Sequence, residues 1–444
     1  MISLDPLLAF VIGMVVLVLI AIKPFKMPAF IALTITALVI GILAGMSPLE
    51  AISTFTQGFG SLVTKIGLVI IFGIILGRYL EVSGAAKSMA LAFLNIFKEK
   101  NAPLGMALSG YVSSIPVYSD VTFVIFTPLM KAISATARIS LPVLAVSLSA
   151  GALATHVFVP PTPGPLAVAG LLNIELGKMI IYGSLAALGM TLGGWAFAVL
   201  YLQRKYPDVY PTLEEISENV STEERLPSAS RSFIALLTPM VLILLNTAGS
   251  ILLPENSSLL AFLKIIGDKN IALMIGAGLA ALLLKDYIGI EGLKKNVDES
   301  LRIAGPIVFI TAAGGGLSSI LKASGAGKAV AEGIAYAGIP PILAVFIVAG
   351  ILKTATGSGT TAVITSATLA TPFVEMGVPP ILIALAAGSG ARLVCHVNDS
   401  FFWVYTKMTG FDTEMGLKTL TIGNIFMALG GFIVTLILAA IGVR

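Results

Sequence analysis

The chain contains very few of the residues that ligate metals or cross-link proteins. Its 444 residues include one cysteine, Cys395, and two histidines, His156 and His396. A single cysteine excludes an internal disulfide and a cysteine-based metal cluster. Two distant histidines and one cysteine also make a poor metal site, so we expect no metal and no cofactor. The sequence lacks the GxSxG, HExxH and Walker-loop patterns, so nothing in it indicates an enzyme.

Charge is also scarce, whereas apolar residues are abundant. Only 11% of residues are charged, against about 25% in a typical soluble domain. Hydrophobic residues make up 57% of the chain, and the mean hydropathy is +1.00. Apolar runs of about 20 residues recur along the whole length, which predicts an all-α, multi-pass membrane protein in a lipid bilayer. The net charge of +4 is spread singly at the ends of these runs, which argues against nucleic-acid binding.

The apolar runs predict membrane spans of two kinds. The first run has no basic stretch before it and no small-residue cleavage site, so we interpret it as a retained span. Between 88 and 174, and between 326 and 411, proline, glycine, serine and threonine interrupt the apolar sequence, which favours a mixture of spans, half-helices and re-entrant hairpins. Uninterrupted spans are predicted at 6–22, 29–45, 60–77, 178–202, 232–253, 270–285, 303–321 and 415–443.

One hydrophilic segment, 203–231, divides the membrane sequence into two halves, 1–202 and 232–444. Basic residues favour the cytoplasmic side of a membrane. We therefore predict a cytoplasmic linker, on the basis of Arg204, Lys205, Arg225 and Arg231. Lys23 and Lys26 follow the first span, which predicts an extracytoplasmic N-terminus.

The two halves carry related sequences. SGAAK at 83–87 recurs as SGAGK at 324–328, and His-Val at 156–157 recurs at 396–397, with displacements of 241 and 240 residues. The predicted topology also makes the two halves start from opposite sides of the membrane. We therefore expect two inverted repeats, which is the plan of many secondary transporters.

Irregular backbone at membrane depth indicates a binding cavity. Every backbone polar group in lipid needs a partner, so broken helices persist only inside protein or beside a water-filled space. Two such stretches occur in each half, at 113–123, 155–165, 352–372 and 388–403.

The two breaks of the first half carry a carboxylate and a histidine. Asp120, next to Ser119, lies in apolar sequence, where a carboxylate is costly unless it faces a cavity or carries a proton. Alternatively, Asp120 lies in a solvated loop. His156 and Thr162 accompany prolines at 160, 161, 163 and 165, which prevent a regular helix and free carbonyl groups for a polar ligand. The alternative is a plain turn with a packed His156.

The first break of the second half is rich in small hydroxyl residues. They predict the start of a half-helix near residue 360, and a helix N-terminus binds anions. The candidate residues are Lys353, Gly357, Ser358, Gly359, Thr360 and Thr361. Two alternatives remain: the small residues serve close helix packing, and Lys353 extends to the membrane interface.

The second break of the second half gives the strongest signal for a site. Four polar residues fall within eight positions of membrane sequence: Arg392, His396, Asn398 and Asp399. The alternative is that Arg392 and Asp399 merely neutralise each other.

Two of these stretches form specific motifs. Residues 156–165 read HVFVPPTPGP, and 395–399 read CHVND. Together with Asp120 and with Lys353 before the Gly-Ser turn, they resemble the gluconate permease family, bacterial proton symporters for gluconate, related sugar acids or D-amino acids. The resemblance implies the ion transporter superfamily fold in the bacterial inner membrane. In that fold a mobile transport domain with two re-entrant hairpins moves against a scaffold domain, often in a homodimer that works as an elevator.

The chain departs from the family pattern around the expected pocket. Thr162 replaces a histidine that many members have, Thr122 replaces a frequent glycine, and Arg392 replaces a small or apolar residue. Gluconate itself is therefore not fixed by the resemblance, and an additional arginine suits a smaller acid.

We expect a secondary transporter that imports gluconate or a related small hydroxylated organic acid together with protons. The carboxylate would bind at residues 357–361, helped by Lys353 or Arg392, and the hydroxyls would bind Ser119, Asn398 and the backbone near Thr162. Asp120 or Asp399 would carry the proton, with His156 and His396 as alternatives. The competing interpretations are a sodium-coupled carboxylate transporter and a D-serine-like permease, followed by a channel and a membrane enzyme.

Overall fold

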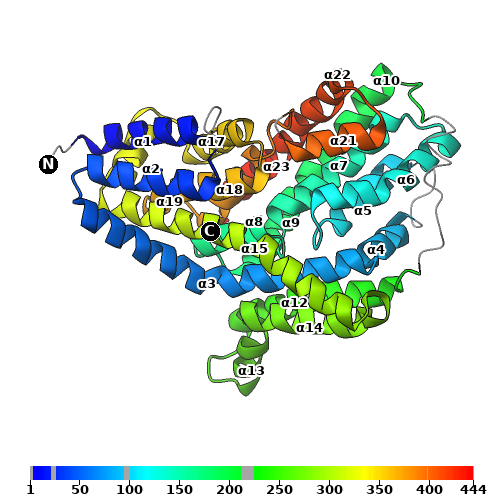
Figure 1. Cartoon of the computed structure of the whole chain (residues 1–444), viewed down its shortest axis with the longest axis horizontal. Helices are drawn as coiled ribbons and strands as arrows, with labels where there is room; N and C mark the ends of the chain where they lie inside the picture. The colour runs from blue at the N-terminus through cyan, green and yellow to red at the C-terminus, as the bar shows by residue number, and fades with distance from the viewer. Residues whose placement is uncertain (1–3, 22–26, 95–100, 212–224, 398, 444) are drawn as a thin grey trace.

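The computed structural model describes residues 4–21, 27–94, 101–211, 225–397 and 399–443, and these residues form helices and connecting turns without any strand (Figure 1). Eight helical segments within them are long and apolar enough to cross a membrane. The prediction of an all-α, multi-pass membrane protein is confirmed.

The helices of the first half have the following bounds: α1 Pro6–Ala21, α2 Ala29–Leu43, α3 Pro48–Val82, α4 Ala85–Leu94, α5 Ala102–Ser113, α6 Ser119–Ala137, α7 Leu141–Phe158, α8 Pro163–Leu171, α9 Leu176–Phe197, the π-helical turn η2 Ala198–Leu202, and α10 Gln203–Lys205. Those of the second half are α12 Ala229–Leu252, α13 Ser258–Ile266, α14 Lys269–Ile288, α15 Ile290–Ala323, α16 Ala326–Tyr336, α17 Pro341–Thr356, α18 Gly359–Leu369, α19 Thr371–Glu375, α20 Pro380–Gly390, α21 Ser400–Thr409, α22 Thr413–Gly416, η3 Leu417–Thr421 and α23 Ile422–Ala440.

The predicted spans coincide with observed helical segments to within three residues at their ends where the structure describes them, but two of those helices are much longer than predicted. Spans 60–77 and 303–321 are the apolar parts of α3 and α15, which have 35 and 34 residues. Helix α3 begins early because Ser47 and Glu50 form a capping box. Charged residues near the end of α3 and the start of α15 lie outside the apolar runs, so hydropathy alone underestimates both helices.

The hydrophilic segment between the halves is shorter than predicted. The π-helical turn and α10 extend α9 as far as Lys205, and α12 already begins at Ala229. The side chain of Ser228 accepts a hydrogen bond from the Arg231 amide at 3.4 Å and caps α12. Residues 212–224 lie outside the described part of the chain. The cytoplasmic location of this segment stays a prediction.

The repeated SGAAK and SGAGK motifs form the same turn. Ser83 and Ser324 are the C-caps of α3 and α15, and the glycine that follows each serine has a positive φ, 76° at Gly84 and 73° at Gly325. The serine hydroxyls accept the amides of the residues two further on, at 3.2 and 3.3 Å. Glycine tolerates this left-handed conformation without strain. The opposite orientation of the two halves stays a prediction.

Packing between the halves follows a paired pattern. Helix α3 packs along α15, and α9 packs along α23. Three further sets of contacts come in exchanged pairs: α2 with α15 and α14 with α3, α1 with α16 and α12 with α4, and α6 with α21 and α18 with α8. In Figure 1 the long helices α3 and α15 cross, with α12 and α14 beneath them, while α5, α6, α7 and α21 lie together at the other end of the molecule.

Small residues allow α3 and α15 to approach closely. A Cβ atom on Gly58 would lie 2.3 Å from the Ser319 hydroxyl oxygen and 2.5 Å from the Gly315 carbonyl oxygen. Gly315 and Gly316 in turn face Leu62 and Phe55 of α3. The triple glycine of α15 thus serves close helix packing, as is common between membrane helices.

The substitution Gly58→Ala is therefore expected to destabilise the crossing of α3 and α15 by about 1–3 kcal/mol, because the added methyl group has no space. Gly60→Ala is the matched control, since no atom lies within 4 Å of a Cβ at that position of the same helix. The control is expected to be neutral or to stabilise the helix by up to about 1 kcal/mol. Thermal unfolding in detergent compares the two variants, and equal midpoints would contradict the packing argument.

Candidate functional site

Four helices begin at breaks that meet in the middle of the molecule. Helices α6, α8, α18 and α21 follow the irregular residues 114–118, 159–162, 357–358 and, for α21, 391–397 and 399. Helix α6 packs on α21, and α8 packs on α18. The Ser400 hydroxyl at the start of α21 donates to Asp120 Oδ2 at the start of α6, at 3.1 Å. A Cβ atom on Gly164, at the start of α8, would lie 3.5 Å from Val363 of α18.

Proline and glycine cause two of these breaks. Pro163 is the first residue of α8, where a missing amide hydrogen costs nothing, and Pro160 and Pro161 precede it. Gly357 ends α17 with a φ of 72°, which reverses the chain before α18. Ser358 then caps α18, accepting the Thr361 amide at 3.2 Å, as the sequence predicts for a half-helix start near residue 360.

Two of the four helix starts have no side-chain cap. Ser358 and Asp399 cap α18 and α21, whereas Tyr118 and Thr162 occupy the capping positions of α6 and α8 without accepting such a bond. The Thr162 hydroxyl instead donates to the Val159 carbonyl at 2.7 Å. The first amides of a helix lack intrahelical partners and carry the positive end of its dipole. Four such dipole ends around one point favour a bound anion, although Pro163 and Pro165 leave α8 with Gly164 as the one amide among its first three residues.

Lys353 and Asp399 form a buried ion pair. Their side chains are 1% and 6% exposed, and the Lys353 ammonium group also donates to the Gly357 carbonyl at 2.8 Å. Asp399 accepts two further hydrogen bonds, from the Cys395 thiol at 3.1 Å and from the Phe401 amide at 2.9 Å. The alternative that Lys353 extends to the membrane interface is wrong, because the side chain is enclosed by protein.

Arg392 is buried beside this pair without an ion pair of its own. The residue is 4% exposed, and within the described residues its Nε atom has no hydrogen-bond partner. A Cβ atom on Gly359 would lie 2.9 Å from the guanidinium carbon, so glycine is required for this approach. Among the described residues the direct ion-pair partner of Asp399 is Lys353, and Arg392 interacts with Asp399 only through its nearby charge. An unpaired buried cation is costly unless a ligand supplies the opposite charge.

Asp120 has an environment quite different from that of Asp399. Its two carboxylate oxygens accept hydrogen bonds from the hydroxyl groups of Ser119 at 3.3 Å and Ser400 at 3.1 Å. No lysine or arginine forms an ion pair with it among the residues that the structure describes. Asp120 is nevertheless close enough to Asp399 and Arg392 to feel both charges.

Three more buried polar atoms next to this cluster lack partners in the described structure: His156 Nδ1, Tyr118 Oη and Thr122 Oγ1. The rings of Tyr118 and His156 lie 5.4 Å apart, and His156 feels the charges of Arg392 and Asp399. Most buried polar atoms in proteins are hydrogen-bonded, so a group of unpartnered ones in one place indicates a ligand. Two of the three, Tyr118 and Thr122, were not among the residues predicted to bind substrate.

The family model described as GntP family permease matches residues 5–441. This chain belongs to the GntP permease family. An uncharacterized permease of Haemophilus influenzae is 35% identical over 92% of this chain and 86% of its own. A gluconate permease of Pseudomonas aeruginosa is 32% identical over 97% and 96%. These relatives are permeases, and the chain is a membrane transporter and not an enzyme, as the sequence indicates.

The fold of this GntP permease is also found in a solved structure. The crystal structure of the YdaH transporter of Alcanivorax borkumensis, described as having an unusual topology, aligns with a TM-score of 0.68. The alignment covers 93% of this chain and 98% of that one at 13% sequence identity. At this identity the likeness concerns the fold alone.

Most residues predicted for the substrate site of this permease come together. Ser119, Asp120, His156, Thr162, Lys353, Arg392 and Asp399 lie at the four breaks, with Gly357, Ser358, Gly359, Thr360 and Thr361 around the start of α18. The carbonyl of His396 accepts the Asp399 amide at 2.8 Å, but no described hydrogen bond joins its ring to the cluster. Asn398 lies outside the described residues. Substrate and proton-coupling roles for all of them stay predictions.

A second charged cluster of the permease was missed by the sequence analysis. Arg78 of α3 bonds Glu299 at 2.6 Å, Glu81 at 2.8 Å and Asn296 at 3.0 Å. Arg78 and Glu81, with Tyr118 and Thr162, line a cavity of about 140 Å³ beside the breaks. The arginine and the glutamate three residues later signal a charged pair within a membrane helix, but only the fold brings α15 to them.

Backbone atoms of two breaks touch α3 at glycines. A Cβ atom on Gly77 would lie 2.1 Å from the Pro116 carbonyl oxygen, and one on Gly73 would lie 2.8 Å from the Pro161 carbonyl oxygen. These glycines are four residues apart and therefore share one face of the helix. Along that face α3 meets the breaks without an intervening side chain.

The substitution Lys353→Met is expected to lower the free energy of unfolding by about 3–5 kcal/mol, because it leaves the Asp399 carboxylate buried without a cation. The double substitution Lys353→Met with Asp399→Asn removes both charges and is expected to recover most of that loss. Thermal unfolding in detergent compares the single and double variants. If the stability losses of Lys353→Met alone and Asp399→Asn alone add up to that of the double variant, the two residues do not stabilise each other.

Proposed function

We propose that this permease is a secondary transporter of the bacterial inner membrane that imports gluconate or a related small hydroxylated acid together with protons. The name of the Pseudomonas aeruginosa relative, gluconate permease, supports the substrate class. One observation carries the proposal: a buried Arg392, without an ion-pair partner among the described residues, lies where the starts of four broken helices come together.

The substrate carboxylate is assigned to Arg392 and the start of α18. The guanidinium group lies against Gly359, so its free nitrogen and the first amides of α18 can bind the same anion. Lys353 has a different task, because Asp399 and the Gly357 carbonyl already occupy its ammonium group. It stabilises the shape of the site and leaves Arg392 as the cation that binds substrate.

The hydroxyl groups of the substrate are assigned to the other wall of the site. His156 Nδ1, Tyr118 Oη and Thr122 Oγ1 are buried atoms without partners in the described structure, and each can exchange a hydrogen bond with an alcohol. An unhydroxylated acid would leave these groups unsatisfied, which costs binding energy. The site thus favours hydroxylated acids over plain fatty acids.

Asp120 is the better proton carrier of the two aspartates. Asp399 binds a lysine, a thiol and an amide, all of which donate to the ionised carboxylate and stabilise its charge. Asp120 binds two hydroxyl groups, which accept as well as donate hydrogen bonds. Both the protonated and the ionised carboxyl group can therefore be satisfied at Asp120. Its closeness to Arg392 links its charge to substrate binding.

The packing pattern supports movement of a transport domain against a scaffold. Helices α8 and α18 both contact α15, and α8 contacts α3, whereas the equivalent helices α21 and α6 make no comparable contact with α3 or α15 in the described residues. If the halves are inverted repeats, the opposite-facing state forms when α21 and α6 take up the contacts with α3 and α15 that α8 and α18 make here. We assign α3 and α15 to the scaffold and the four broken helices to the moving domain, in a homodimer of the kind that the family resemblance implies.

Arg392→Lys is expected to raise KM for gluconate uptake by about 10- to 100-fold, because lysine keeps the charge but loses the planar, two-point contact. The same change at Arg302, an exposed arginine of α15, serves as the control and is expected to leave KM unchanged. Initial rates of labelled gluconate uptake into proteoliposomes give both constants. An unaltered KM in the Arg392 variant would remove this residue from the substrate site.

Asp120→Asn is expected to abolish accumulation driven by a pH gradient while gluconate exchange across the membrane continues, since the amide cannot release a proton. Asp399→Asn is expected instead to reduce stability and binding together, because its ion pair is lost. Uptake and exchange measured between about pH 5 and pH 8 separate the two outcomes. Retained accumulation in the Asp120 variant would assign the proton to another group.

The whole proposal is tested by gluconate accumulation in proteoliposomes under an imposed pH gradient, with and without sodium. Accumulation that needs the pH gradient and no sodium supports proton symport. A strict sodium requirement at fixed pH contradicts it and favours a sodium-coupled carboxylate transporter. Competition by glycerate, lactate and D-serine identifies the acid that binds best, and strong competition by D-serine alone would favour an amino-acid permease.

A further inference from the structure

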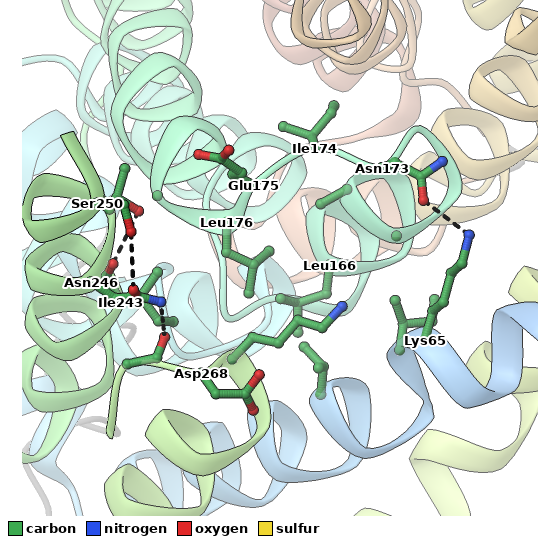
Figure 2. A pocket seen from close by; sticks show the side chains of 18 of the residues that line it. Lys65, Leu166, Asn173, Ile174, Glu175, Leu176, Ile243, Asn246, Ser250 and Asp268 are labelled. Atoms are coloured by element: carbon green, nitrogen blue, oxygen red, sulfur yellow. Dashed lines mark hydrogen bonds between the residues drawn. The ribbon is translucent and has the colours of Figure 1, made fainter. Parts of the chain in front are cut away.

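A cavity of about 480 Å³ lies between α3, the end of α8, the start of α9, and α12 to α14. Figure 2 shows Lys65 and Asn173 on one side of it and Asn246 and Ser250 on the other. With the predicted cytoplasmic linker, the start of α9 and the segment around α13 face the outside of the cell. The cavity then opens toward the outside, whereas the breaks lie deeper in the membrane.

Three lysines from three different helices line this cavity: Lys65 of α3, Lys264 of α13 and Lys269 of α14. Lys65 donates to the neutral Asn173 side chain at 3.0 Å, and none of the three forms an ion pair within the described residues. The ammonium groups of Lys65 and Lys269 are close enough to repel each other. Lysines gathered in this way without ion-pair partners in the described residues are suited to binding an anion.

The carboxylates of the cavity offset the charge of these lysines only in part, since Asp268 attracts Lys269 while Lys65 repels it. Asp268 uses Oδ1 to cap α14, accepting the amides of Asn270 at 2.9 Å and Ile271 at 3.3 Å. Glu175 lies at the start of α9, on the wall opposite Asp268 (Figure 2). The lysines outnumber the carboxylates, so the cavity keeps a positive charge.

Apolar side chains close the inner end of the cavity. Ile66, Val69 and Leu166 line it and are at most 3% exposed. Gly170 packs directly on Ile66, and a Cβ atom on Gly73 would lie 3.0 Å from Leu166. Beyond this seal the neighbouring cavity begins, lined by Gly73, Thr162 and Pro163. The two cavities thus follow each other along the same face of α3, and the second one reaches the breaks.

We propose that the lysine-lined cavity is an outer vestibule that binds the carboxylate of the substrate before it reaches the central site. The ligand class is a small organic anion, and the neutral amides of Asn173 and Asn246 can contact its hydroxyl groups. This proposal rests on the proposed function for the identity of the substrate, but the positive field of the vestibule is measurable without transport.

Cysteine labelling tests the field directly. Ser250→Cys places a thiol in the vestibule, in a Cys395→Ser background that keeps a hydrogen-bond donor to Asp399. The ratio of labelling rates by the anionic reagent MTSES and the cationic reagent MTSET is compared with the ratio for a free thiol. We expect MTSES to be favoured, and we expect Lys65→Gln with Lys269→Gln to lower the ratio about 3- to 10-fold at low salt. High salt should remove the difference.

Lys328→Gln is the matched control, because Lys328 is an exposed lysine of α16 outside the cavity. The vestibule is refuted if this control lowers the ratio as much as the vestibule substitutions, or if those substitutions have no effect. Gluconate is expected to slow MTSES labelling of the Ser250→Cys variant, whereas neutral glucose is not.

Vesicles of different lipid composition test whether the lysines bind the anionic headgroup of a lipid. If phosphatidylglycerol in the vesicles blocks labelling and gluconate does not, the lysines bind a lipid headgroup and the substrate assignment is overturned. If gluconate slows labelling but the protein does not accumulate gluconate, the vestibule is supported and the proposed function is contradicted. A charge-dependent labelling ratio with no protection by gluconate would reject the vestibule as a substrate site.

Discussion

Lys353 and Asp399 come from helices far apart in the sequence, and their ion pair ties the turn after α17 to the start of α21. The pair also determines what the neighbouring charges can do. Because Lys353 satisfies Asp399, Arg392 is left as a buried cation against Gly359, with unpartnered polar atoms close by. Charges are expensive in a membrane, so a buried ion pair contributes to structure, whereas a buried cation without such a partner is suited to binding an anion, as proposed for Arg392.

The surrounding packing explains how such a polar centre can exist within lipid. Half-helices place their N-terminal amides at the centre, where irregular backbone would otherwise lack partners. Exchanged contacts such as α6 on α21 and α18 on α8 build this arrangement from both halves of the chain. Outside the centre, glycines such as Gly58 and Gly315 let the long helices α3 and α15 approach closely, and Arg78 and Glu299 add an ion pair between the same two helices.

Composition and motifs predicted the helical class, the positions of the breaks and most of the residues around them. These features depend on local chemistry: prolines at 160, 161 and 163, a positive-φ glycine at 357 and a serine cap at 358. The partners of the charged residues could not be predicted, because pairing depends on which helices meet. Asp399 binds Lys353 and not Arg392, and Arg78 reaches Glu299 on a helix more than 200 residues away. Tyr118 and Thr122 were not predicted to bind substrate, because a buried polar atom without a hydrogen-bond partner can be recognised only in the structure.

The bare face of α3 has a mechanical consequence. Helices that slide past one another normally have to disengage interlocked side chains, which resists motion. At Gly73 and Gly77 the main chain of α3 instead meets the carbonyl oxygens of Pro161 and Pro116 directly. If the broken segments move against α3 as proposed, these contacts allow sliding along the helix with few side chains to disengage. A methyl group at Gly77 would collide with the Pro116 carbonyl oxygen and hinder such sliding.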